Sequence, residues 1–159
     1  MKSLESEITA LYLLAHELLY LGMDDAPIYS DQFTRLNREV FEKANMLFDL
    51  RGTDIEEEAF LCVSLLMAYN ATLYNNGDKQ ERIQIILDRS WEVLRQLPTS
   101  LLKVRLLAYC YGEVFDKELA SEIHEIFKLW ERRELTSEES EILEYFKWIE
   151  SNPYPYCEI

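Results

Sequence analysis

Two stretches of this sequence are apolar on nearly every side of a helix, and they constrain how the rest of the chain packs. Residues 59–69 read AFLCVSLLMAY, and residues 101–111 read LLKVRLLAYCY. A helix without a polar face is buried between other elements, because water would otherwise contact apolar side chains. We therefore expect two central helices, each covered by neighbouring helices.

The remaining segments carry apolar residues at the three- and four-residue spacing of one helix face. These stripes cover residues 4–18, 33–48, 83–94, 119–130 and 142–149, and no stretch sustains the alternation of a strand. Connections of two to six residues make consecutive helices roughly antiparallel. The sequence predicts an all-α fold: a single compact domain of about seven helices over residues 1–150, packed as antiparallel helical hairpins.

Several helix starts show the pattern in which a Ser, Thr or Asp side chain and a Glu three residues later cap each other's backbone. The pairs that fit are Thr53 with Glu56, Asp78 with Glu81, and Thr136 with Glu139. The chain ends in the tail 151–159, which contains Pro and Tyr. We expect this tail to dock on the protein itself, with docking on a partner as the alternative.

The connector 22–31 contains three aspartates and raises the question of a cation site. A calcium loop needs oxygen ligands at alternating positions around a central Gly, whereas Gly22 precedes the acids here and Pro27 interrupts them. Helix signals explain the segment better: Gly22 ends one helix, Pro27 fixes the turn, and Ser30 or Asp31 caps the next helix. The aspartates concerned are Asp24, Asp25 and Asp31.

No constellation of residues predicts catalysis, a metal or a cofactor. Neither His16 nor His124 has a Glu three residues before it, and His16 lies between two tyrosines, which is typical of a half-buried histidine. Cys110 and His124 can meet across two helices, with Glu113 nearby, but the apolar surroundings of Cys110 raise a thiol pKa. We predict no catalytic, cofactor-binding or metal-binding residues and no enzyme activity; an enzyme with a helical pocket is the least favoured alternative.

Composition limits the partners. The 30 acidic and 16 basic residues give a net charge of -14, which repels nucleic-acid phosphates and anionic membranes and attracts a basic protein. The acidic start and the absence of a long apolar run predict a cytoplasmic protein without a membrane span. Three cysteines without CxxC spacing indicate neither disulfides nor zinc; they are Cys62, Cys110 and Cys157.

Residues 101–127 contain part of a tetratricopeptide pattern. Leu107, Ala108, Tyr111 and Ala120 fall at the expected offsets, but the signature Trp is missing and no second copy recurs. True repeats are therefore not predicted. A helical-hairpin adaptor that binds a peptide or protein in a groove, without a link to transcription, is the alternative function.

Four blocks in this order resemble the UpxZ family of transcription antitermination antagonists. They are AHELLYLGMDDAPIYSDQFTRLNREVFE, TDIEEEAFLCVSLLMAYNATLY, LPTSLLKVRLLAYCYGEVFDKELASEIHEI and ESNPYPY. The resemblance implies a bacterial regulator of capsular polysaccharide loci. It would inhibit NusG-like antitermination factors, called UpxY, of other loci by direct protein–protein binding, without small-molecule substrate or nucleic-acid contact. It assigns no partner-binding residues, so these are unknown at this stage.

Overall fold

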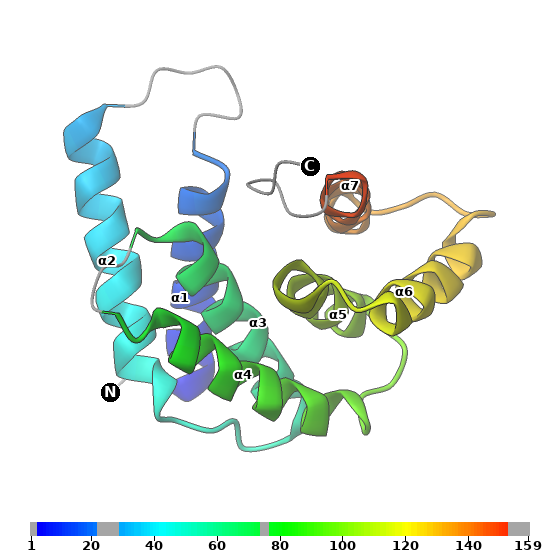
Figure 1. The fold of residues 1–159 in the computed structure, drawn as a ribbon, viewed down its shortest axis with the longest axis horizontal. Helices are drawn as coiled ribbons and strands as arrows, with labels where there is room; N and C mark the ends of the chain where they lie inside the picture. Colours follow the sequence, from blue (N-terminus) through cyan, green and yellow to red (C-terminus); the bar gives the residue numbers. More distant parts are fainter. Residues whose placement is uncertain (1–2, 22–28, 74–76, 153–159) are drawn as a thin grey trace. The chain divides into compact units, whose positions relative to one another are not determined.

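The structure is a computed structural model that describes residues 3–21, 29–73 and 77–152. Within these ranges the chain forms seven α-helices and no strand, which confirms the all-α prediction (Figure 1). The helices are α1 (Leu4–Leu19), α2 (Ser30–Phe48), α3 (Ile55–Ala71), α4 (Lys79–Leu94), α5 (Leu101–Val114), α6 (Lys117–Trp130) and α7 (Ser137–Ser151).

The contacts divide the chain into two compact units. Unit 1, Met1–Leu97, contains α1 to α4, and unit 2, Pro98–Ile159, contains α5 to α7. The boundaries of the predicted domain, 1–150, and of the tail stay a prediction.

In unit 1, α3 is the central helix. It packs on α1, α2 and α4, and α1 also packs on α2, which runs in the opposite direction (Figure 1). Every residue from Ala59 to Tyr69 except Phe60 is buried. Burial of apolar surface on this scale drives folding at roughly 25 cal/mol per Å². The prediction of a buried third helix is therefore confirmed.

In unit 2, α5 packs on α6 and on α7. Residues 106–111 of α5 are all buried, so the second predicted central helix is also confirmed. Phe146 of α7 is fully buried, with ring centroids 5.3 Å from Tyr111 and 5.8 Å from Phe127 of α6. The positions of the tetratricopeptide-like pattern, including Leu107 and Ala120, are core residues of this unit.

Two predicted caps are shifted or wrong, and one is confirmed. Thr136 and Glu139 form the complete capping box of α7. At α3, however, Asp54 is the N-cap and accepts from the Glu57 backbone N–H at 2.8 Å, while Glu57 accepts from the Thr53 N–H. The register is one residue later than predicted, because Asp54 supplies a better acceptor at the cap position.

The start of α4 also differs from the prediction. Asp78 is at the N-cap, but its side chain makes no cap hydrogen bond and instead accepts from Arg82 Nε at 3.1 Å. An ion pair one turn into the helix thus replaces the expected capping box with Glu81.

The start of α2 corrects another prediction. Tyr29 is the N-cap, without a side-chain cap hydrogen bond, and Ser30 is already helical. The Asp31 carboxylate accepts from the Gln32 N–H at 3.0 Å, within the first turn. Neither Ser30 nor Asp31 therefore caps the helix, and Asp31 acts as an acid near the helix N-terminus, where the macrodipole favours it.

The junction of α5 and α6 lies at Phe115 and Asp116. Gly112 is inside α5, and Phe115 ends the helix in the left-handed conformation with φ 52°. Asp116 caps α6 by accepting from the Glu118 N–H at 2.9 Å. The predictions for Gly22, Pro27 and the tail 153–159 lie outside the described residues.

Candidate interaction surface

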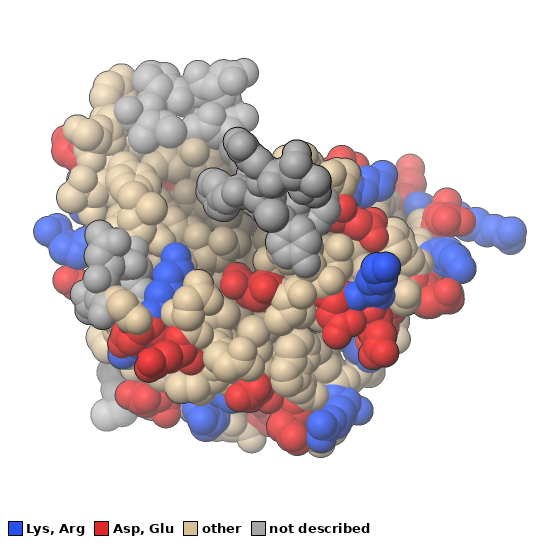
Figure 2. Space-filling view, in the orientation of Figure 1, with Lys and Arg blue, Asp and Glu red and all other residues tan. Residues whose placement is uncertain are grey.

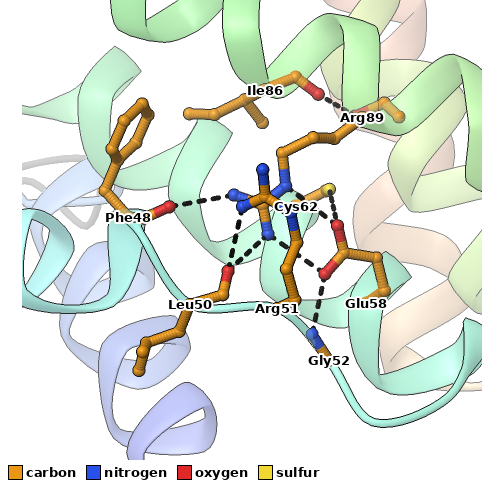
Figure 3. Close-up of polar contacts among 9 residues, drawn as sticks. Phe48, Leu50, Arg51, Gly52, Glu58, Cys62, Ile86 and Arg89 are labelled. Atoms are coloured by element: carbon orange, nitrogen blue, oxygen red, sulfur yellow. Dashed lines mark hydrogen bonds and ion pairs between the residues drawn. The ribbon is translucent and has the colours of Figure 1, made fainter.

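A buried ion pair joins α3 to α4 in unit 1. Arg89 of α4 donates from Nε to Glu58 Oε2 at 2.9 Å and from Nη2 to Glu58 Oε1 at 3.0 Å (Figure 3). The Arg89 side chain is 7% exposed and that of Glu58 is 14% exposed. Such two-pronged contacts are the strongest type of side-chain hydrogen bond in proteins, because both partners are charged and their geometry matches.

The same guanidinium fixes the segment that follows α2. It donates from Nη1 to the Phe48 carbonyl at 3.0 Å and from Nη2 to the Leu50 carbonyl at 2.8 Å (Figure 3). On the other side of the ion pair, Glu58 accepts from the Gly52 N–H at 2.8 Å. We call Glu58, Arg89 and these three backbone groups the clasp, since together they hold residues 48–52 against α3 and α4.

Gly52 is required in the clasp by close approach. A Cβ atom at this position would lie 2.2 Å from the backbone N of Glu58 and 2.6 Å from its Cα. These are backbone atoms of a helix and cannot rotate away. Only glycine therefore brings the loop close enough for its N–H to reach the Glu58 carboxylate.

Cys62 lies beside the clasp, and its thiol is unreactive. Burial raises the pKa of the Cys62 thiol to about 11, and the negative charge of Glu58 adds to the rise. A thiol with a raised pKa is almost entirely protonated at neutral pH and is a poor nucleophile or metal ligand. Its sulfur lies 3.9 Å from Glu58 Oε2 as a weak donor.

An open hollow of about 550 Å³ lies between the α2–α3 loop and the C-terminal half of α4. Its lining combines both charges and apolar side chains: Arg51, Gly52, Thr53, Asp54, Ile55, Glu58, Arg89, Glu92, Val93 and Gln96. The charged groups at its base, Glu58 and Arg89, already bind each other. The arrangement therefore builds a rigid surface whose polar groups serve the fold.

Both histidines contact other side chains of the protein. His16 is half-buried between Tyr12 and Tyr20, with ring centroids 6.0 and 4.6 Å away, as predicted. His124 is exposed and its Nε2 lies 2.8 Å from Glu150 Oε2. Cys110 is fully buried in α5. The structure thus gives His124 a carboxylate partner on α7.

Within the described ranges, no group of three or more His, Cys, Asp or Glu side chains is placed to hold a metal ion. Asp24 and Asp25 lie outside those ranges, so their interpretation as part of a helix connector stays a prediction.

The clasp was not predicted from the sequence. The run Glu56–Glu58 is explained locally by the helix N-terminus, and nothing in it distinguishes Glu58 from its neighbours. A signal does exist on α4, where Arg89 lies in the apolar stripe between Ile86 and Val93. An arginine on a buried face requires a partner, because an unpaired charge there is costly.

On the face shown in Figure 2, acidic and basic side chains lie among each other. Unit 1 contains 17 acidic and 9 basic residues, and unit 2 contains 13 and 7, so both units are net negative. Among the residues that the structure describes, the large apolar side chains with more than half of their surface exposed are Leu13, Tyr29, Met46, Leu73, Leu129 and Trp148. Because acidic residues outnumber basic ones in both units, neither unit has the basic excess of a nucleic-acid-binding domain.

No helix in the described parts of the chain is both long and apolar enough to cross a membrane. Comparison with curated proteins gives no match to the sequence. The sequence model of the UpxZ family of transcription anti-terminator antagonists matches residues 8–112.

A solved structure covers almost the whole molecule. The crystal structure of a transcription anti-terminator antagonist UpxZ from Bacteroides uniformis ATCC 8492 is 48% identical in sequence, with a TM-score of 0.89, over 99% of both chains. Both descriptions name a regulator of transcription, in agreement with the prediction that the protein is not an enzyme. The chain belongs to the UpxZ family of transcription anti-terminator antagonists.

Proposed function

We propose that this protein acts in the cytoplasm by binding directly to a NusG-like antitermination factor and preventing it from promoting read-through. The family is defined by antagonism of anti-terminators, and this membership is the observation that carries the proposal. The factor would be the UpxY-type protein of another capsular polysaccharide locus, as the family resemblance implies. The mechanism needs an occluding surface and no chemical step.

The charge of the protein supports a basic protein as partner. Acidic residues outnumber basic ones by 14. Many of the basic side chains already contact a carboxylate of the same unit, as Lys43 does with Glu7 and Lys103 with Glu122. Carboxylates therefore remain in excess at the surface. Such an excess accelerates association with a basic surface and disfavours competing nucleic acid.

The rigidity of unit 1 also supports occlusion. The clasp fixes the loop 48–52 before any partner arrives, so binding does not have to order this segment. Preorganised surfaces bind more tightly because less conformational entropy is lost on association.

A leader read-through reporter tests the proposal. Cells or a purified transcription system would carry a polysaccharide-locus leader before a reporter gene, with an antitermination factor, with and without this protein. We expect read-through to fall when the protein is added to a factor from another locus. Unchanged read-through with every antitermination factor tested would contradict the proposal.

Co-purification across a salt series tests the electrostatic part separately. Exposed charge interactions are screened within about 8 Å at 0.15 M salt and within about 3 Å at 1 M. We expect recovery of the antitermination factor to fall steadily as salt rises. Recovery that is indifferent to salt would leave direct binding intact and remove the charge-based account of it.

A further inference from the structure

Trp148 differs from the other tryptophans of the chain. It is 55% exposed on α7, whereas Trp130 is buried and Trp91 is half-buried. Exposing a large indole to water is unfavourable, and tryptophan is enriched among the residues that dominate binding energy at protein interfaces. Its position therefore calls for an explanation outside the packing of unit 2.

The neighbour of Trp148 on the same helix face is Glu144, four residues earlier. Side chains at this spacing lie about 5–6 Å apart at Cβ. The Glu144 side chain is 72% exposed, and the side chain of Lys147, with which it pairs at 3.9 Å, is also exposed. An exposed pair at this distance contributes almost nothing to stability, so Glu144 is available to another cation.

Other glutamates of α7 are engaged within unit 2. Glu138 accepts from Arg105 at 3.0 Å, and Glu150 lies 2.8 Å from His124. Glu139 holds Arg133 with two hydrogen bonds of 2.7 and 2.8 Å. Glu144, beside the exposed indole, thus has the weakest of these contacts.

The chain itself shows what a tryptophan and a glutamate do together. The Arg133 guanidinium lies 5.5 Å from the centre of the Trp130 ring, while Glu139 accepts two hydrogen bonds from it. The cation is thus attracted by the ring face and neutralised by the carboxylate at the same time. Trp148 and Glu144 offer the same two groups to the outside, without the arginine.

We propose that Trp148 and Glu144 form a docking site for a basic side chain of the protein partner, and that this side chain is an arginine and not a lysine. Arginine stacks on an aromatic face and binds a carboxylate with two hydrogen bonds, which lysine does not do. The net negative charge of unit 2 attracts such a segment. The identity of this partner as an antitermination factor rests on the proposed function.

Binding of a purified antitermination factor to variants tests the site. Trp148→Ala should weaken binding by about 5- to 30-fold, the range of a partly desolvated cation–ring contact. Trp148→Phe should recover part of the loss, and Trp148→Leu should not, because leucine is apolar but has no aromatic ring. Leu129→Ala, at a more exposed apolar residue of the same unit, is the matched control and should bind as the unchanged protein does.

A second measurement does not depend on the antitermination factor. A short arginine–glycine peptide, titrated into the protein, should change tryptophan emission in the unchanged protein and leave Trp148→Phe unaffected. Glu144→Gln should weaken the response, and a serine–glycine peptide should give none. An equal response in Trp148→Phe, or none in the unchanged protein, overturns the docking site.

The outcomes separate the two proposals. If the unchanged protein binds the factor and Trp148→Ala binds it equally well, the docking site is wrong and the proposed function stands. If no factor binds but the peptide responds through Trp148, the site stands and the identity of the partner is wrong.

Discussion

Replacing Arg89 by Met should be among the most destabilising single changes in unit 1. The substitution removes two charge-assisted hydrogen bonds to Glu58 and one each to the carbonyls of Phe48 and Leu50. It also leaves the Glu58 carboxylate, mostly buried, with no arginine. Removing one partner of a buried ion pair costs about 3–5 kcal/mol. That is a large share of the roughly 5–15 kcal/mol that stabilises a typical domain.

Urea unfolding followed by circular dichroism measures this cost. With a slope of about 2 kcal/mol per M, the midpoint should fall by roughly 2 M. Arg95→Met is the matched control on the same helix, because Arg95 pairs with Glu92 at the surface, where both side chains are largely exposed. An exposed pair contributes about 0–1 kcal/mol, so the control should hardly shift the midpoint.

A double variant separates the ion pair from its parts. Glu58→Gln together with Arg89→Met removes both charges, so no unpaired carboxylate remains. We expect it to be more stable than Arg89→Met alone, since the buried unpaired charge causes most of the loss. If Arg89→Met shifts the midpoint no more than Arg95→Met does, the clasp does not hold the loop and this reasoning is wrong.

Three further predictions follow from local contacts. Gly52→Ala should destabilise unit 1 by about 1–3 kcal/mol or more in the same urea assay, because its Cβ would overlap the Glu58 backbone; an unchanged midpoint would contradict this. Hydrogen bonds from Arg133 and Thr136 lower the pKa of Glu139 to about 2. Glu139 therefore stabilises α7 above pH ~4.5, and this contribution is lost as the pH falls towards 2. The midpoint of thermal unfolding of Glu139→Gln should differ from that of the unchanged protein at pH 7 and converge with it near pH 2. Burial raises the pKa of Cys62 to about 11, so iodoacetamide should label Cys62 at pH 8 at least ~100-fold more slowly than a free thiol. Mass spectrometry of the labelled peptides measures this rate. Fast labelling of Cys62 in the folded protein would refute its burial.

Patterns that act over a few residues gave correct predictions at some positions and wrong ones at others. The apolar run 59–69 had to be buried because no polar face was available, and Thr136 with Glu139 formed the expected box. Thr53 was assigned as a cap although Asp54 is adjacent and is the better acceptor, so the choice between neighbours depended on one residue of register. The Asp78 cap was wrong because Arg82, one turn later, competes for the same carboxylate.

Features that join distant residues were not predicted. Glu58 and Arg89 are 31 residues apart, and the approach of Gly52 to α3 depends on the loop path that this pair sets. The sequence also did not predict the exposure of Trp148, because a tryptophan in an amphipathic helix is as compatible with the core as with the surface. Family resemblance supplied the function, since the residues themselves contain no catalytic pattern.

A purified transcription system shows whether this protein inhibits an antitermination factor by itself. RNA polymerase, a polysaccharide-locus leader template and an antitermination factor from another locus would be combined with increasing amounts of this protein, and the read-through transcript would be quantified. We expect read-through to fall, as the protein concentration rises, to the level seen without the factor, and we expect high salt to weaken this inhibition. Read-through that stays constant while the protein is present in excess over the factor would contradict it.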